Sequence, residues 1–179
     1  MIKPKDFIKI FPELEEISDN GLKEGVIKIW LLAIKRGKWK SLENIPFTLL
    51  IPTKISLIEH TRRVTRMAMA IVRERKDLNL DLIIAGGLTH DVGKLLEYER
   101  KEGKVIKSKF GSMMRHPVSG AALALKVGLP KEVAHIIAAH SEEGEKVKRI
   151  PEAIAIHHCD FIDFEIEKNQ IETRHERWR

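Results

Sequence analysis

Near its middle the chain carries the stretch His90-Asp91-Val92-Gly93-Lys94, in which an imidazole and a carboxylate stand side by side. Further side chains of the same two types lie on either side of it, namely His60, His116, His140 and Asp160. Imidazole nitrogens and carboxylate oxygens together suit a divalent transition metal that keeps open positions for water. Because a metal held in this way makes water a nucleophile at neutral pH, the pattern predicts a metal-dependent hydrolase.

A metal site gathered from several helices needs each ligand on the inward-facing side of its helix. Residues 56–76 place His60 on an apolar stripe at helical spacing, which turns its imidazole toward the core. His140 and Asp160 each share a face with apolar residues of a later predicted helix. The three residues therefore meet the condition for ligands.

The doublet needs a special position to act as a pair of ligands. Residues 81–90 form an apolar predicted helix that ends at the doublet. Neighbouring side chains on a helix diverge, so His90 and Asp91 can share an ion only at a helix end or a kink. Gly93, just beyond the doublet, would permit such a kink.

The rest of the chain is also predicted to be mostly helical, so we expect an all-α fold. One further helix is predicted over residues 22–36. Because proline suits the first turn of a helix, others are predicted to begin at Pro117, Pro130 and Pro151. His116 would lie directly before the first residue of the first of these helices. Three segments are expected to be non-helical: an extended stretch at 45–52, a loop at 100–115, and a frayed tail from about residue 165.

The composition predicts one soluble globular domain over residues 1–179, with 43% hydrophobic and 32% charged residues. Within it we expect an amino-terminal helical extension over residues 1–52 and a metal-binding core over residues 53–168. No apolar run approaches the roughly 18 residues that cross a bilayer, and the first residues lack the apolar region of a signal peptide. We therefore expect a cytoplasmic protein without membrane association. The net charge of +6 favours an anionic partner.

The order of these histidines and aspartates resembles the HD superfamily of metal-dependent phosphohydrolases. The stretch His-Asp-Val-Gly-Lys is the most specific part of the match, which runs from about residue 55 to 165. The resemblance implies an all-helical bundle, here preceded by the amino-terminal extension. It also implies that one divalent ion is bound by four side chains: His60, His90, Asp91 and Asp160.

Some branches of this superfamily carry two further histidines between the doublet and the final aspartate. They include ribonuclease Y, HD-type phosphodiesterases and HD-type diadenosine tetraphosphate hydrolases. In those branches the two histidines hold a second ion, and the aspartate of the doublet bridges both ions. His116 and His140 match this pattern, which implies the same roles for them and for Asp91. The alternative is that His116 caps a helix and His140 packs in the core. Mixed imidazole and carboxylate ligands suit manganese, iron, cobalt or nickel better than magnesium, for one or two divalent ions.

Basic side chains near these ligands are candidates for contact with a phosphate. They are Lys94, Arg115 and Arg63. Lys94 could instead be a solvated lysine at a helix end, and the resemblance favours phosphate contact. Asp91 and Lys94 are the candidate catalytic residues: Asp91 would help to position the nucleophile, and Lys94 would neutralise charge that builds on the phosphate.

We therefore expect a phosphohydrolase that cleaves a phosphomonoester or phosphodiester bond, most simply in a nucleotide. Positive charge and the likeness to ribonuclease Y leave a nucleic-acid phosphodiesterase open, although an aromatic fraction of 6% offers few platforms for base stacking. The third alternative is a non-catalytic module that keeps its metal and senses a nucleotide. The complete ligand set argues against this last reading.

Overall fold

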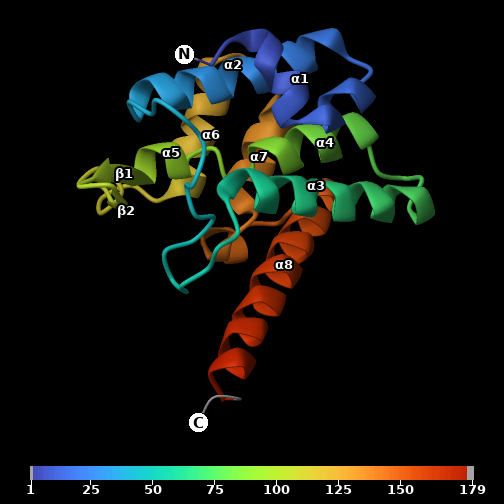
Figure 1. Cartoon of the computed structure of the whole chain (residues 1–179). Helices are drawn as coiled ribbons and strands as arrows, with labels where there is room; N and C mark the ends of the chain where they lie inside the picture. Colours follow the sequence, from blue (N-terminus) through green and yellow to red (C-terminus); the bar gives the residue numbers. More distant parts are fainter. Residues whose placement is uncertain (1, 177–179) are drawn as a thin grey trace.

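A computed structural model of the chain describes residues 2–176 and consists mainly of packed helices (Figure 1). The amino-terminal elements are η1 (Pro4–Asp6), α1 (Phe7–Ile10), η2 (Pro12–Glu16) and α2 (Asn20–Arg36). The later helices are α3 (Leu57–Glu74), α4 (Leu80–Thr89), α5 (Lys94–Glu97), α6 (His116–Lys126), α7 (Lys131–Ala139), η3 (Glu142–Lys146) and α8 (Pro151–Glu176). The prediction of a helical fold with amino-terminal helices is confirmed, apart from one small hairpin.

Helix α4 lies among the other helices of the bundle. Its residues 83–89 are all buried, which is typical of a helix that protein surrounds on every side. The side chain of Asn79 caps the helix, because it accepts a hydrogen bond from the backbone nitrogen of Leu82. Helix α4 packs against α2, α3, α7 and α8. The residues at its carboxyl end therefore reach the interior of the bundle.

The amino-terminal helices cover one side of α4 and hold the backbone around the His-Asp doublet (Figure 1). The indole nitrogen of Trp30 donates a hydrogen bond to the carbonyl oxygen of Leu88 at 2.8 Å. The indole nitrogen of Trp39 donates to the carbonyl oxygen of Leu95 at 2.7 Å. These two carbonyl groups flank the doublet, so the two tryptophans fix the segment that carries it.

The predicted loop at residues 100–115 is wrong in its first part. Strand β1 (Tyr98–Lys101) pairs with β2 (Lys104–Lys107) in an antiparallel hairpin. Glu102 and Gly103 form the turn, with φ angles of 51° and 79°. A two-residue turn with both φ angles positive matches the twist of the strands that it joins. The lysine-rich composition hid these strands, because their alternating apolar residues are few.

The predicted fraying from about residue 165 is also wrong, because α8 continues to Glu176. No glycine or proline follows Pro151, and the last turns are rich in glutamate and also carry Lys168 and Arg174, residue types that favour helix. Figure 1 shows the end of α8 projecting away from the other helices. Among the described residues, none of the helices combines the length and the apolar character needed to span a membrane.

The 46–56 loop connects the amino-terminal helices to α3 and contains no helix, and its strand-like pairing is limited to an isolated antiparallel bridge between Pro46 and Ser56. Its ends are held together, because Phe47 donates a backbone hydrogen bond to the carbonyl of Ile55 at 3.2 Å. The hydroxyl of Thr53 donates to Glu167 on α8 at 2.8 Å. The loop is thus tied to α8 as well as to α3.

Candidate metal centre

Side chains singled out from the sequence meet at one place inside the bundle. They come from five separate regions: the first turn of α3, the end of α4, the start of α6, the end of α7 and the middle of α8. Asp160 is 16% exposed at its side chain, and the other members are buried. The six residues are His60, His90, Asp91, His116, His140 and Asp160.

The doublet lies where α4 stops. Helix α4 ends at Thr89, and a turn leads to α5. In this turn the Nε2 atom of His90 lies 3.5 Å from Oδ2 of Asp91, so the neighbouring side chains converge. The doublet thus lies at a helix end, one of the two positions that the sequence allowed, and Gly93 keeps ordinary right-handed helical angles, with φ of −63°. A Cβ there would lie 2.1 Å from the carbonyl oxygen of His116. The glycine is needed because it lets the start of α6 approach the doublet.

Each of the four imidazoles has its Nδ1 atom fixed by an acceptor. The acceptors for His90 and His140 are the carbonyl oxygens of Gly87 and Ile137, each at 2.7 Å. A carbonyl can only accept, so Nδ1 carries the hydrogen in these rings, and Nε2 of the neutral ring holds a lone pair. The acceptors for the other two rings, His60 and His116, are carboxylates. All four rings therefore present Nε2 to the centre, as metal-ligating histidines commonly do.

One group of ligand atoms consists of His60, His90 and Asp160. The Nε2 atom of His60 lies 3.0 Å from Oδ1 of Asp160 and 3.4 Å from Nε2 of His90. Two nitrogen lone pairs at this separation repel each other unless a proton or a cation lies between them.

A second group consists of His90, Asp91 and His140, and it overlaps the first. Oδ1 of Asp91 lies 3.6 Å from Nε2 of His140 and 3.3 Å from Nε2 of His116. Oδ2 of the same carboxylate lies 3.5 Å from Nε2 of His60. Asp91 therefore belongs to the second group and also faces the first, because Oδ2 lies near His60 and His90 while Oδ1 lies near His116 and His140.

These arrangements fit bound metal ions. Two ligands that each lie about 2.1 Å from one ion are at most about 4.2 Å apart, and every separation given above is shorter. Among residues 2–176, Oδ1 of Asp91 is a buried carboxylate oxygen without a hydrogen-bond donor. Leaving such an atom without a partner is costly, and a cation between Asp91 and the facing imidazoles would supply one.

The ionisation of the centre reflects its concentration of charge. Burial opposes the charged form of Asp91, but the Lys94 ammonium and nearby histidines outweigh it and hold the pKa of Asp91 well below its usual range. Burial lowers the pKa of His116 to about 4 despite its bond to Glu97. Burial also opposes charge on His60, but its carboxylate neighbours outweigh this and raise its pKa. Without a cation, the carboxylates around His60 therefore favour its protonated form.

Two carboxylates that support the imidazoles were not found from the sequence. Asp163 accepts from Nδ1 of His60 at 2.7 Å, and its spacing of one helical turn after Asp160 could have indicated it. Glu97 accepts from both the backbone nitrogen and Nδ1 of His116, each at 2.7 Å. No local sequence signal marks Glu97, because the fold alone brings α5 and α6 together.

A pocket of about 570 Å³ opens onto the centre. Its polar part includes Lys94, whose Nζ atom donates to Oδ2 of Asp91 and to the carbonyl oxygen of Phe47, each at 2.6 Å. Arg115 also lines the pocket, with Nε 3.0 Å from Glu143. Further polar residues of the lining are Thr48, Glu97, Lys107, Ser141 and Glu142. Its apolar part consists of Phe47, Leu49, Leu50, Tyr98, Phe161 and Phe164.

Arg63 does not line this pocket. Its guanidinium forms an ion pair with Glu59 one turn earlier on α3, and its NH1 atom lies 3.7 Å from Asp163. A phosphate in the pocket would therefore meet Lys94 and Arg115 before Arg63. The contact that the sequence suggested for Arg63 has no support in this arrangement.

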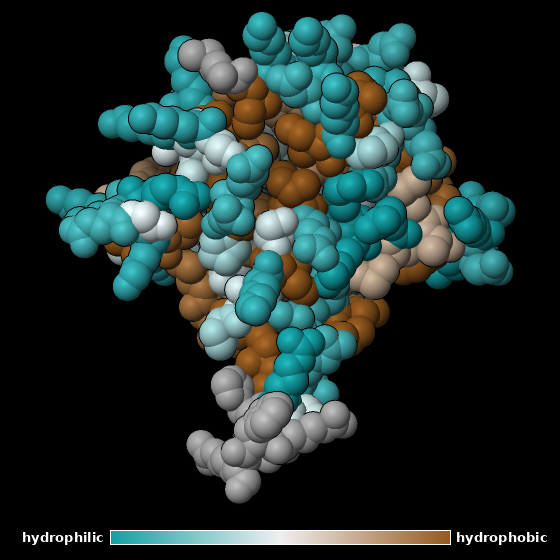
Figure 2. Space-filling view, viewed as in Figure 1, coloured by the Kyte–Doolittle hydropathy of each residue, from teal (hydrophilic) through white to brown (hydrophobic). Residues whose placement is uncertain are grey.

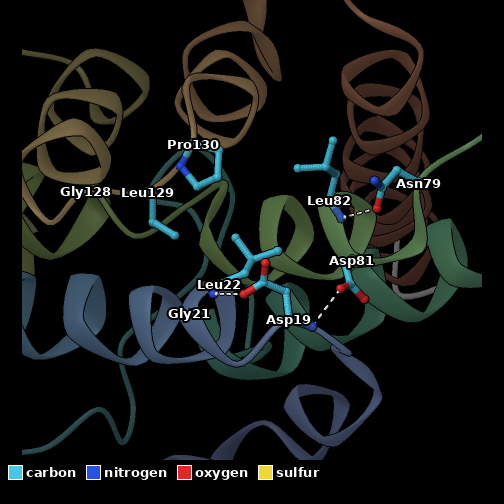
Figure 3. A pocket seen from close by; sticks show the side chains of 9 residues that line it. All are labelled: Asp19, Gly21, Leu22, Asn79, Asp81, Leu82, Gly128, Leu129 and Pro130. Carbon is cyan, nitrogen blue, oxygen red and sulfur yellow. Dashed lines mark hydrogen bonds between the residues drawn. The ribbon is translucent and has the colours of Figure 1, made fainter.

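A second pocket, of about 420 Å³, lies between the start of α2, the start of α4 and the turn before α7 (Figure 3). Its two carboxylates are engaged by the protein. Asp19 accepts from the backbone of Leu22, and Asp81 accepts from the backbone of Asp19. The carboxylates of this pocket therefore hold helix ends in place and are not free to act on a substrate.

Comparison with known families agrees with this centre. The profile of the HD domain matches residues 57–165, from the first residue of α3 to the turn of α8 beyond Asp160. The chain belongs to the HD domain family. All six residues of the candidate metal centre lie within the matched segment of the HD domain.

Two relatives match part of the chain. The chain is 35% identical over 116 residues to dihydroneopterin 2',3'-cyclic phosphate phosphodiesterase of Methanocaldococcus jannaschii. This match covers 62% of the chain and 47% of that protein. The chain is 31% identical over 101 residues to ribonuclease Y of Mycoplasma capricolum, covering 56% of this chain and 17% of that protein. The match thus spans less than half of the length of either relative. No solved structure matches the chain.

Proposed function

We propose that the chain hydrolyses a phosphodiester bond in a small, nucleotide-like substrate and uses one or two divalent transition-metal ions. The observation that carries the proposal is the buried Oδ1 atom of Asp91, which lacks a donor and faces two imidazole nitrogens beside a pocket. The names of the relatives favour a diester over a monoester, because one is a cyclic phosphate phosphodiesterase and another a ribonuclease.

The ligands divide into two sets that share Asp91. His60, His90 and Asp160 would hold one ion with Asp91, and His116 and His140 would hold the second. When bound, such ions lower the pKa of water and polarise a phosphoryl oxygen. The residues fit manganese, iron, cobalt or nickel as the tightly bound ion.

Lys94 and Arg115 are proposed to bind the phosphate. An ammonium group has three hydrogens, and two of those on Lys94 are used by Asp91 and Phe47. The third remains for a phosphate oxygen. Arg115 uses Nε for Glu143, which leaves the other guanidinium hydrogens for the substrate. The low pKa of Asp91 keeps this carboxylate ionised, so it acts as an anionic ligand and not as a proton donor.

A ribonuclease is the second candidate, since the relatives include ribonuclease Y and the chain has a net charge of +6. The size of the pocket favours a small substrate, because about 570 Å³ is within the range of sites for single small molecules. A strand of RNA would have to extend well beyond it.

The test is to strip the purified chain with a chelator, reload it separately with manganese, cobalt, nickel or iron, and offer three kinds of substrate. These are nucleoside 2',3'-cyclic phosphates, nucleoside monophosphates and short RNA. We expect ring opening of the cyclic phosphates that is lost on chelation and restored by metal. Cleavage of RNA alone would favour the ribonuclease. Metal-loaded protein that cleaves none of them would contradict the proposal and support a non-catalytic sensor.

A further inference from the structure

Two chemically different sets of residues line the pocket at the metal centre. The charged set, which we call the charged end, consists of Lys94, Glu97, Lys107, Arg115, Glu142 and Asp160. The other end is made by Phe161 and Phe164, which follow Asp160 along α8, and by apolar residues of the 46–56 loop. A substrate whose phosphate sits at the charged end must therefore place its remaining part against an apolar surface.

The apolar end is open to a ligand. Leu50 is 79% exposed and Leu49 is 40% exposed, although both line the pocket. Phe161 and Phe164 are half-buried. In Figure 2, hydrophobic residues are visible among hydrophilic ones on the lower part of the molecule, where α8 leaves the other helices in Figure 1. Covering apolar surface at such a site is favourable, since it removes that surface from water.

The apolar end is also held at a fixed place relative to the metal ligands. The buried ring of Phe47 stacks on the ring of His60, with centroids 4.4 Å apart. Phe47 in turn meets Phe164 edge to face, with centroids 6.3 Å apart. Its carbonyl accepts from Lys94, so one residue touches a metal ligand, a phosphate-binding cation and the aromatic wall. Such rigid aromatic surfaces bind flat rings with little loss of conformational freedom.

We infer that the apolar end is a recognition site for a flat heteroaromatic ring, such as a purine or a pterin, carried by the phosphoester substrate. The ring lies against Phe161 and Phe164, and Leu50 covers its outer edge. Phe161 and Phe164 are thus specificity-determining residues that act on binding, while the metal ligands act on the phosphate. This inference rests on the proposed phosphodiesterase function and adds the class of substrate.

The decisive comparison uses one ring-bearing and one ring-free substrate. Guanosine 2',3'-cyclic phosphate carries the ring, and glycerol 1,2-cyclic phosphate offers the same reacting group without it. We expect Phe161→Ala to raise KM for the guanosine ester about 10- to 100-fold, as stacking losses do, with little change in kcat. KM for the glycerol ester should stay as in the wild type. Phe161→Leu keeps apolar volume without a flat face, so its KM for the guanosine ester should lie between those of the wild type and Phe161→Ala.

The neighbouring Ile162 supplies the matched control. It is exposed on the same turn of α8 and does not line the pocket, so Ile162→Ala should leave both KM values unchanged. The inference is overturned if the wild type cleaves both esters with equal kcat/KM. It is also overturned if Phe161→Ala raises KM equally for the guanosine and the glycerol ester. The same holds if an alkyl phosphoester without a ring inhibits cleavage as strongly as a guanosine phosphoester does.

A calorimetric titration separates this inference from the proposed function. Guanosine monophosphate and inorganic phosphate would each be added to metal-loaded wild type and to Phe161→Ala. If the chain cleaves no ester, the proposed function fails, yet tighter binding of the nucleotide than of phosphate, lost in the variant, still supports the ring site. Equal binding of the two ligands, or no effect of the variant, would overturn the ring site while leaving the hydrolysis intact.

Discussion

One oxygen of Glu97, Oε2, accepts two hydrogen bonds from the same residue, His116: one from its backbone nitrogen and one from Nδ1, both at 2.7 Å. This arrangement fixes the position of the first residue of α6 and the tautomer of its ring. A carboxylate that holds a ligating histidine in this way acts on the affinity of the metal as well as on the geometry.

We therefore expect Glu97→Ala to weaken binding of one ion per chain by about 10- to 100-fold. Glu97→Gln should lose less metal affinity, because its amide oxygen can still accept a hydrogen bond from His116. The measurement is the metal content and affinity of each variant by elemental analysis and competition with a chelator. Glu99→Ala is the control, because Glu99 is exposed on the adjacent strand. Unchanged metal content in Glu97→Ala would show that His116 is not held for a metal.

Lys94 is expected to stabilise the metal-free protein, because it neutralises the buried carboxylate of Asp91 at 2.6 Å. Removing one partner of a buried pair typically costs about 3–5 kcal/mol. Lys94→Met should lower the free energy of unfolding of the stripped protein by that amount in a urea titration. The loss should be smaller in metal-loaded protein, where a cation also faces Asp91. Lys101→Met, at an exposed position, should have little effect. A loss below about 1 kcal/mol in the stripped protein would contradict the role given to this pair.

The helical fold was predictable because most of its elements carry their own signals. The stripe that contains His60 marks α3 in the local sequence. Pro130 just before α7 and Pro151 at the start of α8 mark those two helices. The β1–β2 hairpin was missed because its strands are charged and short, so that tertiary position decides their structure more than residue pattern does.

The six metal-centre residues were predicted as a set because their residue types are rare on apolar faces. The residues that hold their imidazole rings in place were not predicted, because Glu97 and Phe47 reach the centre only through packing between segments distant in the sequence. The expected phosphate contact of Arg63 stays a prediction. The spacing of this residue from His60 suggests proximity, yet Glu59 lies one turn away on the same helix and pairs with it.

Metal binding should couple to the stability of the whole bundle, since the proposed ligands come from five regions of the chain. Adding manganese to stripped protein at about one hundred times its Kd stabilises a folded state by roughly 2.7 kcal/mol. For a chain of this length that is a rise in Tm of about 5–10 °C. Asp91→Ala, which removes the shared ligand, should abolish both the rise and turnover. Asp77→Ala, at an exposed position, should keep both. A full rise in Tm with Asp91→Ala would show that manganese stabilises the chain elsewhere.

The attachment of the amino-terminal segment to α4 should depend on pH through Asp81. Burial raises the pKa of this carboxyl, but hydrogen bonds from Ser18 and from the backbone of Asp19 outweigh it and lower the pKa (Figure 3). A group with a lowered pKa in the folded state stabilises the protein fully above its unfolded pKa, about 3.9 for Asp, and loses this contribution as the pH falls through the folded value. Asp81→Asn should therefore lower the free energy of unfolding at pH 7, and the difference from wild type should shrink steadily below about pH 4. Urea titrations of stripped protein at pH 7, 5, 4 and 3 measure it. A difference that stays constant over this range would mean that Asp81 acts through shape and not through charge.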